Sequence, residues 1–286
     1  MTAPMARRAQ PWLGTLVEVR VEGLDAAAAA RAIDLAFREI AAIHRLMSFH
    51  AFGSDLDRLH RAPVGSRVRV DARTHEVLGA ALRIAEASGG AFDPTVAARR
   101  VARGRLPRPA SSWQPDGSAD WRDIELCSGN HVRLARAAWI DLGGIAKGYA
   151  VDRAVAILGD EGAAQACINA GGDLRIAGGR AEIVHLQAAG RFAPLTALEI
   201  ANGAVATSDV ARSIVGRSPD DAGARRRAAR ASLVSVAAPT CLVADAMTKV
   251  VALADTAATS AVLARFQAQA CVERAGSGWH RLGAAA

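Results

Sequence analysis

The order of strand-like and helix-like segments constrains the fold of this chain more than any other feature. Residues 14–21 alternate apolar and polar side chains, which predicts a half-buried strand. Residues 25–47 carry apolar side chains at steps of three and four, which predicts a long helix with one apolar face. Later strand and helix patterns are interspersed without strict alternation and without an internal repeat. This order favours an α+β fold over a doubly wound parallel sheet.

The remaining patterns complete this prediction. A helix capped by Asp71 is expected to run to Ala87 and to end at two glycines. Residues 103–120 are rich in Pro, Gly, Ser and Arg, which predicts a long loop and a boundary between lobes of one domain spanning 1–286. Strands are predicted at 64–70, 132–134 and 138–141 and near 166–169, 173–177, 182–187, 195–200 and 231–237, and helices at 145–158, 243–253 and 256–266.

The positive charge of the chain bears on its partners. A formal net charge of +7 fits either a solvated basic surface or the attraction of an anionic ligand. Four arginines within residues 225–230 lie in a stretch of Gly, Ala and Asp that contains no aromatic side chain. Such a stretch predicts an exposed loop, so we expect no nucleic-acid partner.

Several sequence features bear on the compartment. The chain contains no run of about 18 apolar residues, so no transmembrane segment is expected. The four cysteines form no CxxC pair, which argues against a zinc cage and fits a reducing compartment. Neither a signal peptide nor a lipobox cysteine is visible. These features predict a cytoplasmic protein as encoded, whereas a mis-annotated start would instead allow the periplasmic side of the inner membrane.

The segment WIDLGGIAKGY, residues 139–149, has the clearest chemical pattern. A strand is expected to deliver Asp141 to a turn in which Gly143 and Gly144 allow close approach of a ligand. The helix that follows would present free N–H groups, which favour phosphate oxygens, with Lys147 in its first turn. The alternative interpretation is an ordinary strand-to-helix turn with a solvated lysine.

Three further segments have both structural and functional interpretations. INAGGDL, residues 168–174, is either a simple turn or a backbone clasp for a planar ring. AFDPTV, residues 91–96, is either a turn or a loop that presents Asp93 outward. In residues 239–251, Asp245 and Thr248 share one helix face and form half of a shell suited to Mg²⁺. The alternative there is an exposed Asp245 that is paired with Lys249.

Taken together, the order and spacing of these segments resemble the FAD:protein FMN transferase (ApbE-like) family. The resemblance covers about residues 12–255 and includes WLGT, MSFH, GGAFDPTV, DLGGIAKGYAVD, NAGGD, GAVATS and APTCLVADAMTKV. It implies a two-lobed α+β architecture related to T-folds, with FAD in a cleft between the lobes. It also implies a flavinyltransferase that uses Mg²⁺ to move FMN from FAD to a Ser or Thr hydroxyl of an acceptor flavoprotein or redox-complex subunit and releases AMP.

The resemblance also implies roles for individual residues. Catalytic roles fall to Asp245, which would hold the metal, and to Lys147, which would balance developing charge. The metal ligands would be Asp245, Thr248 and the carbonyl of Gly144. FAD contacts are implied for Leu13, His50, Ala91, Phe92, Asp93, Asp141, Lys147, Asn169, Gly171, Gly172 and Thr207.

The sequence departs from the family pattern at two places. Lys249 stands where the family has Thr or Ser four residues after the metal Asp, and an ammonium cannot bind Mg²⁺. Ser213 stands where a histidine is expected, and a hydroxyl cannot replace an imidazole as a base near neutral pH. These departures support an alternative hypothesis of a degenerate relative that binds FAD and acts as a flavin carrier or assembly factor.

Overall fold

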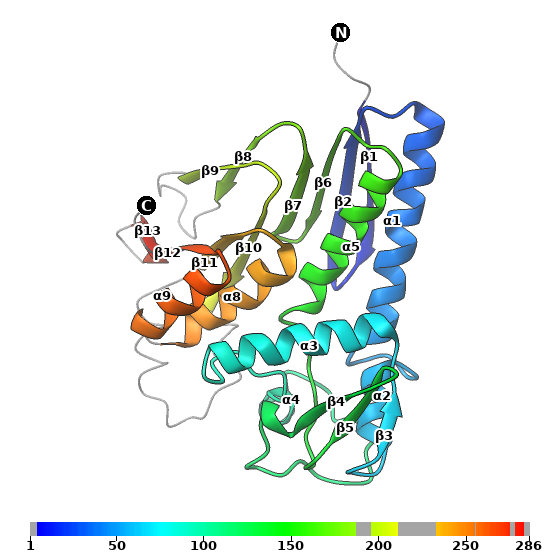
Figure 1. Cartoon of the computed structure of the whole chain (residues 1–286), viewed down its shortest axis with the longest axis vertical. Coiled ribbons are helices and arrows are strands. Elements are labelled where there is room, and N and C mark those ends of the chain that lie inside the picture. The colour runs from blue at the N-terminus through cyan, green and yellow to red at the C-terminus, as the bar shows by residue number, and fades with distance from the viewer. Residues whose placement is uncertain (1–4, 187–195, 211–232, 255, 275–277, 283–286) are drawn as a thin grey trace.

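The centre of the molecule is an eight-stranded sheet in which every pair of neighbouring strands is antiparallel (Figure 1). The computed structural model describes residues 5–186, 196–210, 233–254, 256–274 and 278–282. This mixture of helices with an antiparallel sheet confirms the predicted α+β class. In spatial order the strands are β1 (Met5–Trp12), β2 (Thr15–Glu22), β6 (Gln165–Ala170), β7 (Asp173–Gly178), β10 (Ala204–Asp209), β11 (Leu233–Ala238), β12 (Gln269–Arg274) and β13 (Gly278–Leu282).

Helices cover one face of this sheet, in the order α1 (Ala26–Met47), α5 (Ala146–Asp160), α8 (Cys241–Leu253) and α9 (Thr256–Arg265) (Figure 1). The side chains of β2 alternate between buried and exposed, which explains why one face of the sheet is covered. Val17, Val19 and Val21 are fully buried, while their neighbours are partly or fully exposed. The hairpin of β8 (Glu182–Leu186) and β9 (Thr196–Ile200) belongs to a second, smaller apolar cluster, whose buried members are Ile176, Leu186, Ile200, Val205 and Cys271.

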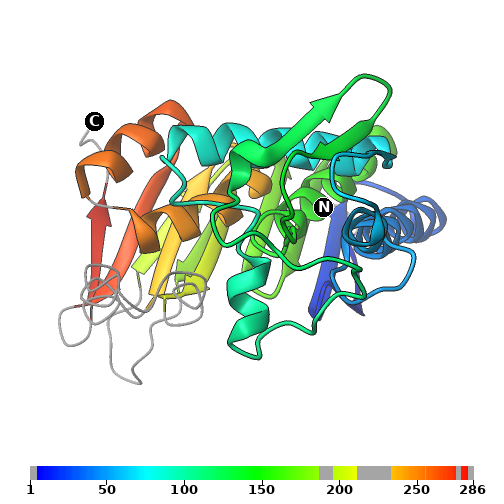
Figure 2. The same cartoon turned by 90° about the horizontal axis from the view of Figure 1, so that it is seen from below.

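A smaller unit lies at one end of the large sheet, as Figures 1 and 2 show from two directions. Its three-stranded sheet has the order β3 (Arg67–Arg69), β5 (His131–Leu134), β4 (Ile124–Cys127). Residues 103–120 contain no helix or strand, and the lobe boundary expected there stays a prediction. The helical elements of this unit are α2 (Asp55–Arg61), α3 (Ala72–Ala87), α4 (Ala97–Ala102) and the 3₁₀ turn η1 (Trp121–Asp123).

The long helices match their sequence predictions, but some strands do not. Residues 138–141 form no strand, because their backbone pairs with a loop and a side chain instead of a neighbouring strand. The Asp141 N–H donates to the Pro94 carbonyl at 2.8 Å, and the Ile140 N–H donates to His60 Nε2 at 2.8 Å. The strand predicted at 64–70 is limited to β3. The sequence patterns also missed β1, β4, β10, β12 and β13.

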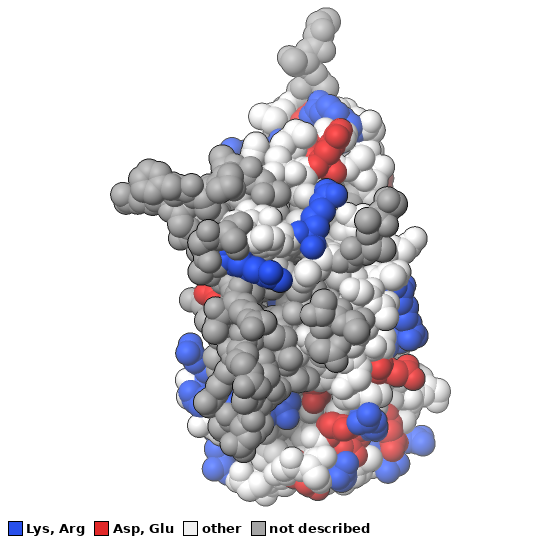
Figure 3. Space-filling view, turned by 90° about the vertical axis from the view of Figure 1, so that its left-hand side faces the viewer, with Lys and Arg blue, Asp and Glu red and all other residues white. Residues whose placement is uncertain are grey.

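The surface and the helices bear on the partner classes considered above. On the face drawn in Figure 3, the basic side chains are scattered and lie among acidic ones toward the lower end. Within the described part of the chain, no helix has the length and apolar character that crossing a membrane requires. All four cysteines are free thiols.

Candidate functional site

A cavity of about 400 Å³ is lined by residues of both the large sheet unit and the smaller unit. The smaller unit contributes Gly90–Asp93 and one side of α4, and the larger unit contributes the turns after β1 and β6, the end of β10, and α8. The wall combines apolar side chains with exposed backbone at glycines, and the basic side chains on it are Arg99, Arg100, Lys147 and Lys249. Such a lining suits a ligand that has both a flat apolar part and an anionic part.

The turn before α5 forms part of the cavity wall. Asp141 holds the turn, since its Oδ1 accepts a hydrogen bond from the Gly143 N–H at 2.8 Å and its Oδ2 accepts one from Arg100. The N-cap residue of α5, Ile145, provides no side-chain cap. The N–H groups of Ile145 and Ala146 donate to the Leu142 carbonyl at 3.0 and 2.9 Å, and the Gly148 N–H lowers the pKa of the Asp245 carboxylate, so this N-terminus is partly capped from within the protein. The phosphate contact predicted there stays a prediction.

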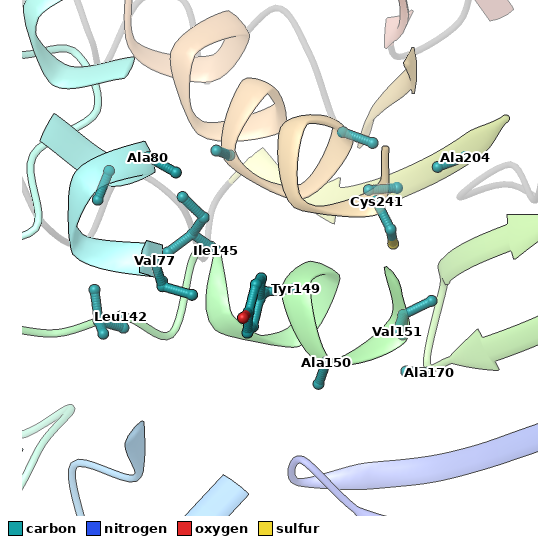
Figure 4. Packing of buried hydrophobic residues seen from close by; sticks show 14 of the residues in the cluster. Val77, Ala80, Leu142, Ile145, Tyr149, Ala150, Val151, Ala170, Ala204 and Cys241 are labelled. Carbon is teal, nitrogen blue, oxygen red and sulfur yellow. The ribbon is translucent and has the colours of Figure 1, made fainter. Parts of the chain in front are cut away.

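The crossing of α5 and α8 positions the charged residues of the site. Figure 4 shows the start of α8, with Cys241, lying against α5. At Gly148 the helices are so close that an added Cβ would lie 2.2 Å from the Cys241 carbonyl oxygen. One turn later, the Asp152 carboxylate accepts hydrogen bonds from the N–H groups of Cys241 and Leu242, both at 2.8 Å. Asp152 therefore caps the N-terminus of α8 from the neighbouring helix.

Two lysines and two aspartates form a charged cluster at the edge of the cavity. Lys147 Nζ donates to Asp173 Oδ2 and lies 4.0 Å from Asp245 Oδ2. Lys249 Nζ donates to Asp245 Oδ1 at 2.5 Å. The side chains of Asp173 and Asp245 are 2% and 0% exposed, whereas those of Lys147 and Lys249 are 29% and 22% exposed. The buried carboxylates are thus paired with two lysines whose side chains line the cavity.

Burial and the neighbouring charges together set the protonation of this cluster. Burial would raise the pKa of Asp245, but Lys147 and Lys249 outweigh it and the pKa is lowered. Burial would lower the pKa of Lys147, but Asp245 and Asp173 outweigh it and the pKa is raised. Burial, with the charge of Asp245, raises the pKa of Asp173 to about 6. At neutral pH Lys147 is therefore an ammonium, and Asp173 and Asp245 are carboxylates.

The oxygens expected to bind Mg²⁺ are largely engaged by other groups. Thr248 Oγ1 donates to the Asp245 carbonyl at 2.7 Å and accepts from Lys249 Nζ at 2.9 Å. Asp245 Oδ2 has no hydrogen-bond partner, but it faces Lys147. A divalent cation about 4 Å from one ammonium would be repelled by about 8 kcal/mol at an effective dielectric constant near 20. The donor set as arranged therefore does not fit Mg²⁺.

Several alternatives left open by the sequence are now decided. Asp245 is paired with Lys249 but is fully buried, so the interpretation of an exposed pair is wrong. Lys147 is bound to a buried carboxylate, so it is not simply a solvated lysine. Asp93 stabilises a turn, since its Oδ1 accepts from the N–H and hydroxyl of Thr95 at 2.8 and 2.7 Å, yet it also lines the cavity.

The predicted FAD contacts are distributed over two adjoining cavities. A neighbouring cavity of about 580 Å³ shares Gly171 and Thr207 with the first and is also lined by Asn169 and Gly172. His50 lies on an exposed loop and lines neither cavity. The predicted FAD contacts that line the first cavity are Leu13, Ala91, Phe92, Asp93, Asp141, Lys147, Gly171 and Thr207, and Gly144, predicted as a metal ligand, lines it as well.

Sequence reasoning assigned no role to some residues of the site. Asp152 and Asp173 lie within DLGGIAKGYAVD and NAGGD, but their partners are 89 and 26 residues away in sequence. Ser208, the last residue of GAVATS, accepts a hydrogen bond from Lys249 Nζ at 3.0 Å. The one general rule that pointed to these pairs is that a buried carboxylate requires a hydrogen-bond or charge partner. Ser213 and the arginines of 225–230 lie outside the described residues.

Comparisons with known proteins were made by sequence and by structure. The ApbE family model matches residues 13–272. The FAD:protein FMN transferase of Treponema pallidum (strain Nichols) is 30% identical over 181 residues, which cover 58% of this chain and 50% of that protein. The protein of the same name from Rhodobacter capsulatus is 31% identical over 177 residues, 58% of this chain and 33% of its own length. The matched part therefore spans half or less of these curated relatives.

Solved structures show the same fold. The flavin transferase ApbE from Vibrio cholerae has a TM-score of 0.79 and 18% identity, with 98% of this chain and 96% of that chain covered. The flavinyl transferase ApbE from Pseudomonas stutzeri, in its apo form, has a TM-score of 0.80 and 18% identity, with 99% and 96% covered. The ApbE protein from Thermotoga maritima has a TM-score of 0.78 and 23% identity, with 98% and 97% covered.

Proposed function

The chain belongs to the ApbE family, and on that premise we propose that it transfers FMN from FAD to a Ser or Thr hydroxyl of an acceptor protein. Two curated relatives bear the name FAD:protein FMN transferase. The observation that carries the proposal is the cavity itself. It is lined by the cationic side chains of Lys147 and Lys249 at the start of α5 and on α8, and by apolar side chains such as Leu13 and Phe92. A flavin dinucleotide has the matching parts, a flat ring system and a diphosphate.

The proposed reaction exchanges one phosphate ester bond for another. The acceptor hydroxyl oxygen forms a bond to the phosphorus on the flavin side, and the bond from that phosphorus to the bridging oxygen breaks. AMP leaves with that oxygen and its electron pair, and the hydroxyl proton passes to the leaving phosphate or to water. The two negative charges of the diphosphate repel an incoming oxygen, so cationic groups near the phosphorus lower the barrier.

Individual residues have defined tasks in this proposal. Lys147, held by Asp173, would place its ammonium near the diphosphate and balance the charge that develops on the leaving oxygen. The N-terminus of α5 and the Gly143–Gly144 turn would bind phosphate oxygens. The apolar faces of Leu13 and Phe92 would contact a ring system, and the adjoining cavity at Gly172 gives a long dinucleotide room to extend. The oxygens of Asp245 and Thr248 expected to bind Mg²⁺ are engaged by other groups, and no step here depends on a metal ion.

Mass spectrometry of an acceptor protein tests the proposal. Purified protein is incubated with FAD and with a candidate redox-complex subunit that has an exposed Ser or Thr, and AMP is followed by chromatography. Covalent FMN on that hydroxyl with stoichiometric AMP is the expected result, and Lys147→Met should reduce the rate by at least about tenfold. Bound FAD that is never cleaved would favour the flavin carrier instead, and failure to bind FAD would refute both functions.

A further inference from the structure

We propose that the Lys249 ammonium is the fixed cation of this cavity and that FAD binding and FMN transfer by this chain need no divalent metal ion. The inference rests on the proposed function and concerns how the same cavity handles the diphosphate. It starts from the mismatch between the oxygens expected to bind Mg²⁺ and the partners that they have in the structure.

The position of the Lys249 ammonium is fixed by three oxygens. Its Nζ lies 2.5 Å from Asp245 Oδ1, 2.9 Å from Thr248 Oγ1 and 3.0 Å from Ser208 Oγ. These contacts match the three N–H donors of an ammonium group, which has no acceptor. Two of these oxygens belong to residues that were expected to coordinate Mg²⁺. The lysine has therefore taken over the partners that a metal ion would require.

The stem of Lys249 also fills the space beside the third expected ligand. A Cβ added to Gly144 would lie 3.3 Å from Lys249 Cε and 3.7 Å from its Cγ. The methylene groups thus pack against the turn whose carbonyl was expected to complete the metal site. Lys249 links α8 to the turn before α5, which is the connection that a bridging cation would otherwise supply.

The cluster leaves no unpaired carboxylate of the protein for a divalent cation to neutralise. Asp173 and Asp245 are balanced by Lys147 and Lys249, so the four groups together have no net charge. Their arrangement still favours an anion, because both carboxylates are buried whereas both lysine side chains are partly exposed and line the cavity. A diphosphate that enters the cavity would therefore come closer to the two lysines than to the two carboxylates.

Titration of FAD with and without free metal tests this inference. The FAD dissociation constant of the wild type is measured by flavin fluorescence in EDTA and then in excess Mg²⁺, and transfer is followed under the same conditions. We expect the two constants to differ by less than about threefold. A wild type that loses roughly tenfold or more in FAD affinity in EDTA, and regains it with Mg²⁺, would overturn the inference.

Two substitutions at the same position separate charge from metal binding. Lys249→Thr removes the cation and adds a hydroxyl, so FAD affinity in EDTA should fall roughly tenfold to hundredfold and Mg²⁺ should restore it. Lys249→Met keeps the packing stem but offers no oxygen, so the same loss should persist in Mg²⁺. Equal FAD affinity in all three proteins would contradict a role for the ammonium, and thermal unfolding checks that the variants are folded.

A direct metal-binding measurement keeps this test separate from that of the proposed function. Binding of Mn²⁺ to the wild type and to Lys249→Thr is measured by electron paramagnetic resonance without FAD. The inference predicts no stoichiometric Mn²⁺ on the wild type and a gain on the variant, and stoichiometric Mn²⁺ on the wild type would overturn it. If FAD binds but is never cleaved under any condition, the transfer reaction fails while metal-independent binding is still decided by these measurements.

Discussion

Replacing Gly148 by alanine should separate α5 from α8 and destabilise the protein. The added Cβ would lie 2.2 Å from the Cys241 carbonyl oxygen and 2.5 Å from its carbon, where normal contacts are about 3.5–4 Å. Overpacking of this kind costs about 1–3 kcal/mol, and moving α8 also weakens the two hydrogen bonds from its N-terminus to Asp152. The gain of up to about 1 kcal/mol in helix propensity offsets part of this loss. The net loss should be roughly 1–3 kcal/mol.

Gly159→Ala in the same helix is the matched control, since nothing lies within 4 Å of a Cβ added there. It should stabilise the protein by about 0.5–1 kcal/mol, because alanine favours the helix over glycine. Urea unfolding of the two variants and the wild type measures both effects. If both substitutions stabilised the protein equally, the close crossing of α5 and α8 at Gly148 would be refuted.

The other predictions concern the cap of α8 and the buried histidine. Asp152→Ala should lower the free energy of unfolding, measured in urea, by about 2–3 kcal/mol, because two N–H groups lose their acceptor. Asp152→Asn should lower it less, since the amide oxygen still accepts a hydrogen bond. Equal losses in the two variants would contradict this account of the cap. Burial lowers the pKa of His60 to about 4, while His60 Nε2 accepts from the Ile140 N–H at 2.8 Å. The unfolded chain therefore binds more protons than the folded protein between these pKa values, so stability should fall by up to about 3 kcal/mol as the pH drops from about 6.5 to 4. His60→Gln should flatten that part of the pH profile, and an unchanged profile in the variant would assign the acid sensitivity to other groups.

The parts of the fold that could be predicted from sequence are those with long periodic patterns. The helix α1 has buried residues at steps of three and four over 22 residues, so its pattern is unambiguous. Residues 138–141 are apolar enough for a strand, but their hydrogen-bond partners are Pro94 and His60, which no local pattern reveals. The strands β12 and β13 are short and pair with each other, and their assignment depends on a neighbour that the sequence does not identify.

For the site, the sequence indicated which segments meet but not how their charges pair. The glycine turn before α5 and the helix with Asp245 were expected to converge, and Lys147 Nζ does lie 4.0 Å from Asp245 Oδ2. The motif could not show that Lys249 points inward, because a lysine on a helix reaches solvent or a neighbour with equal ease. Its direction follows from Ser208, which is 41 residues away and supplies one of its three acceptors.

The docking of α8 on α5 links the stability of this protein to its chemistry. Gly148 and Asp152 lie one turn apart on α5 and fix the start of α8, while Lys147 beside Gly148 faces Asp245 on α8. A shift of α8 that relieves a clash at Gly148 would therefore also change the distance between the two ammonium groups. Since misplacement of catalytic groups by about 1 Å can reduce rates by about a hundredfold, Gly148→Ala should impair FAD handling more than its loss of stability alone would explain.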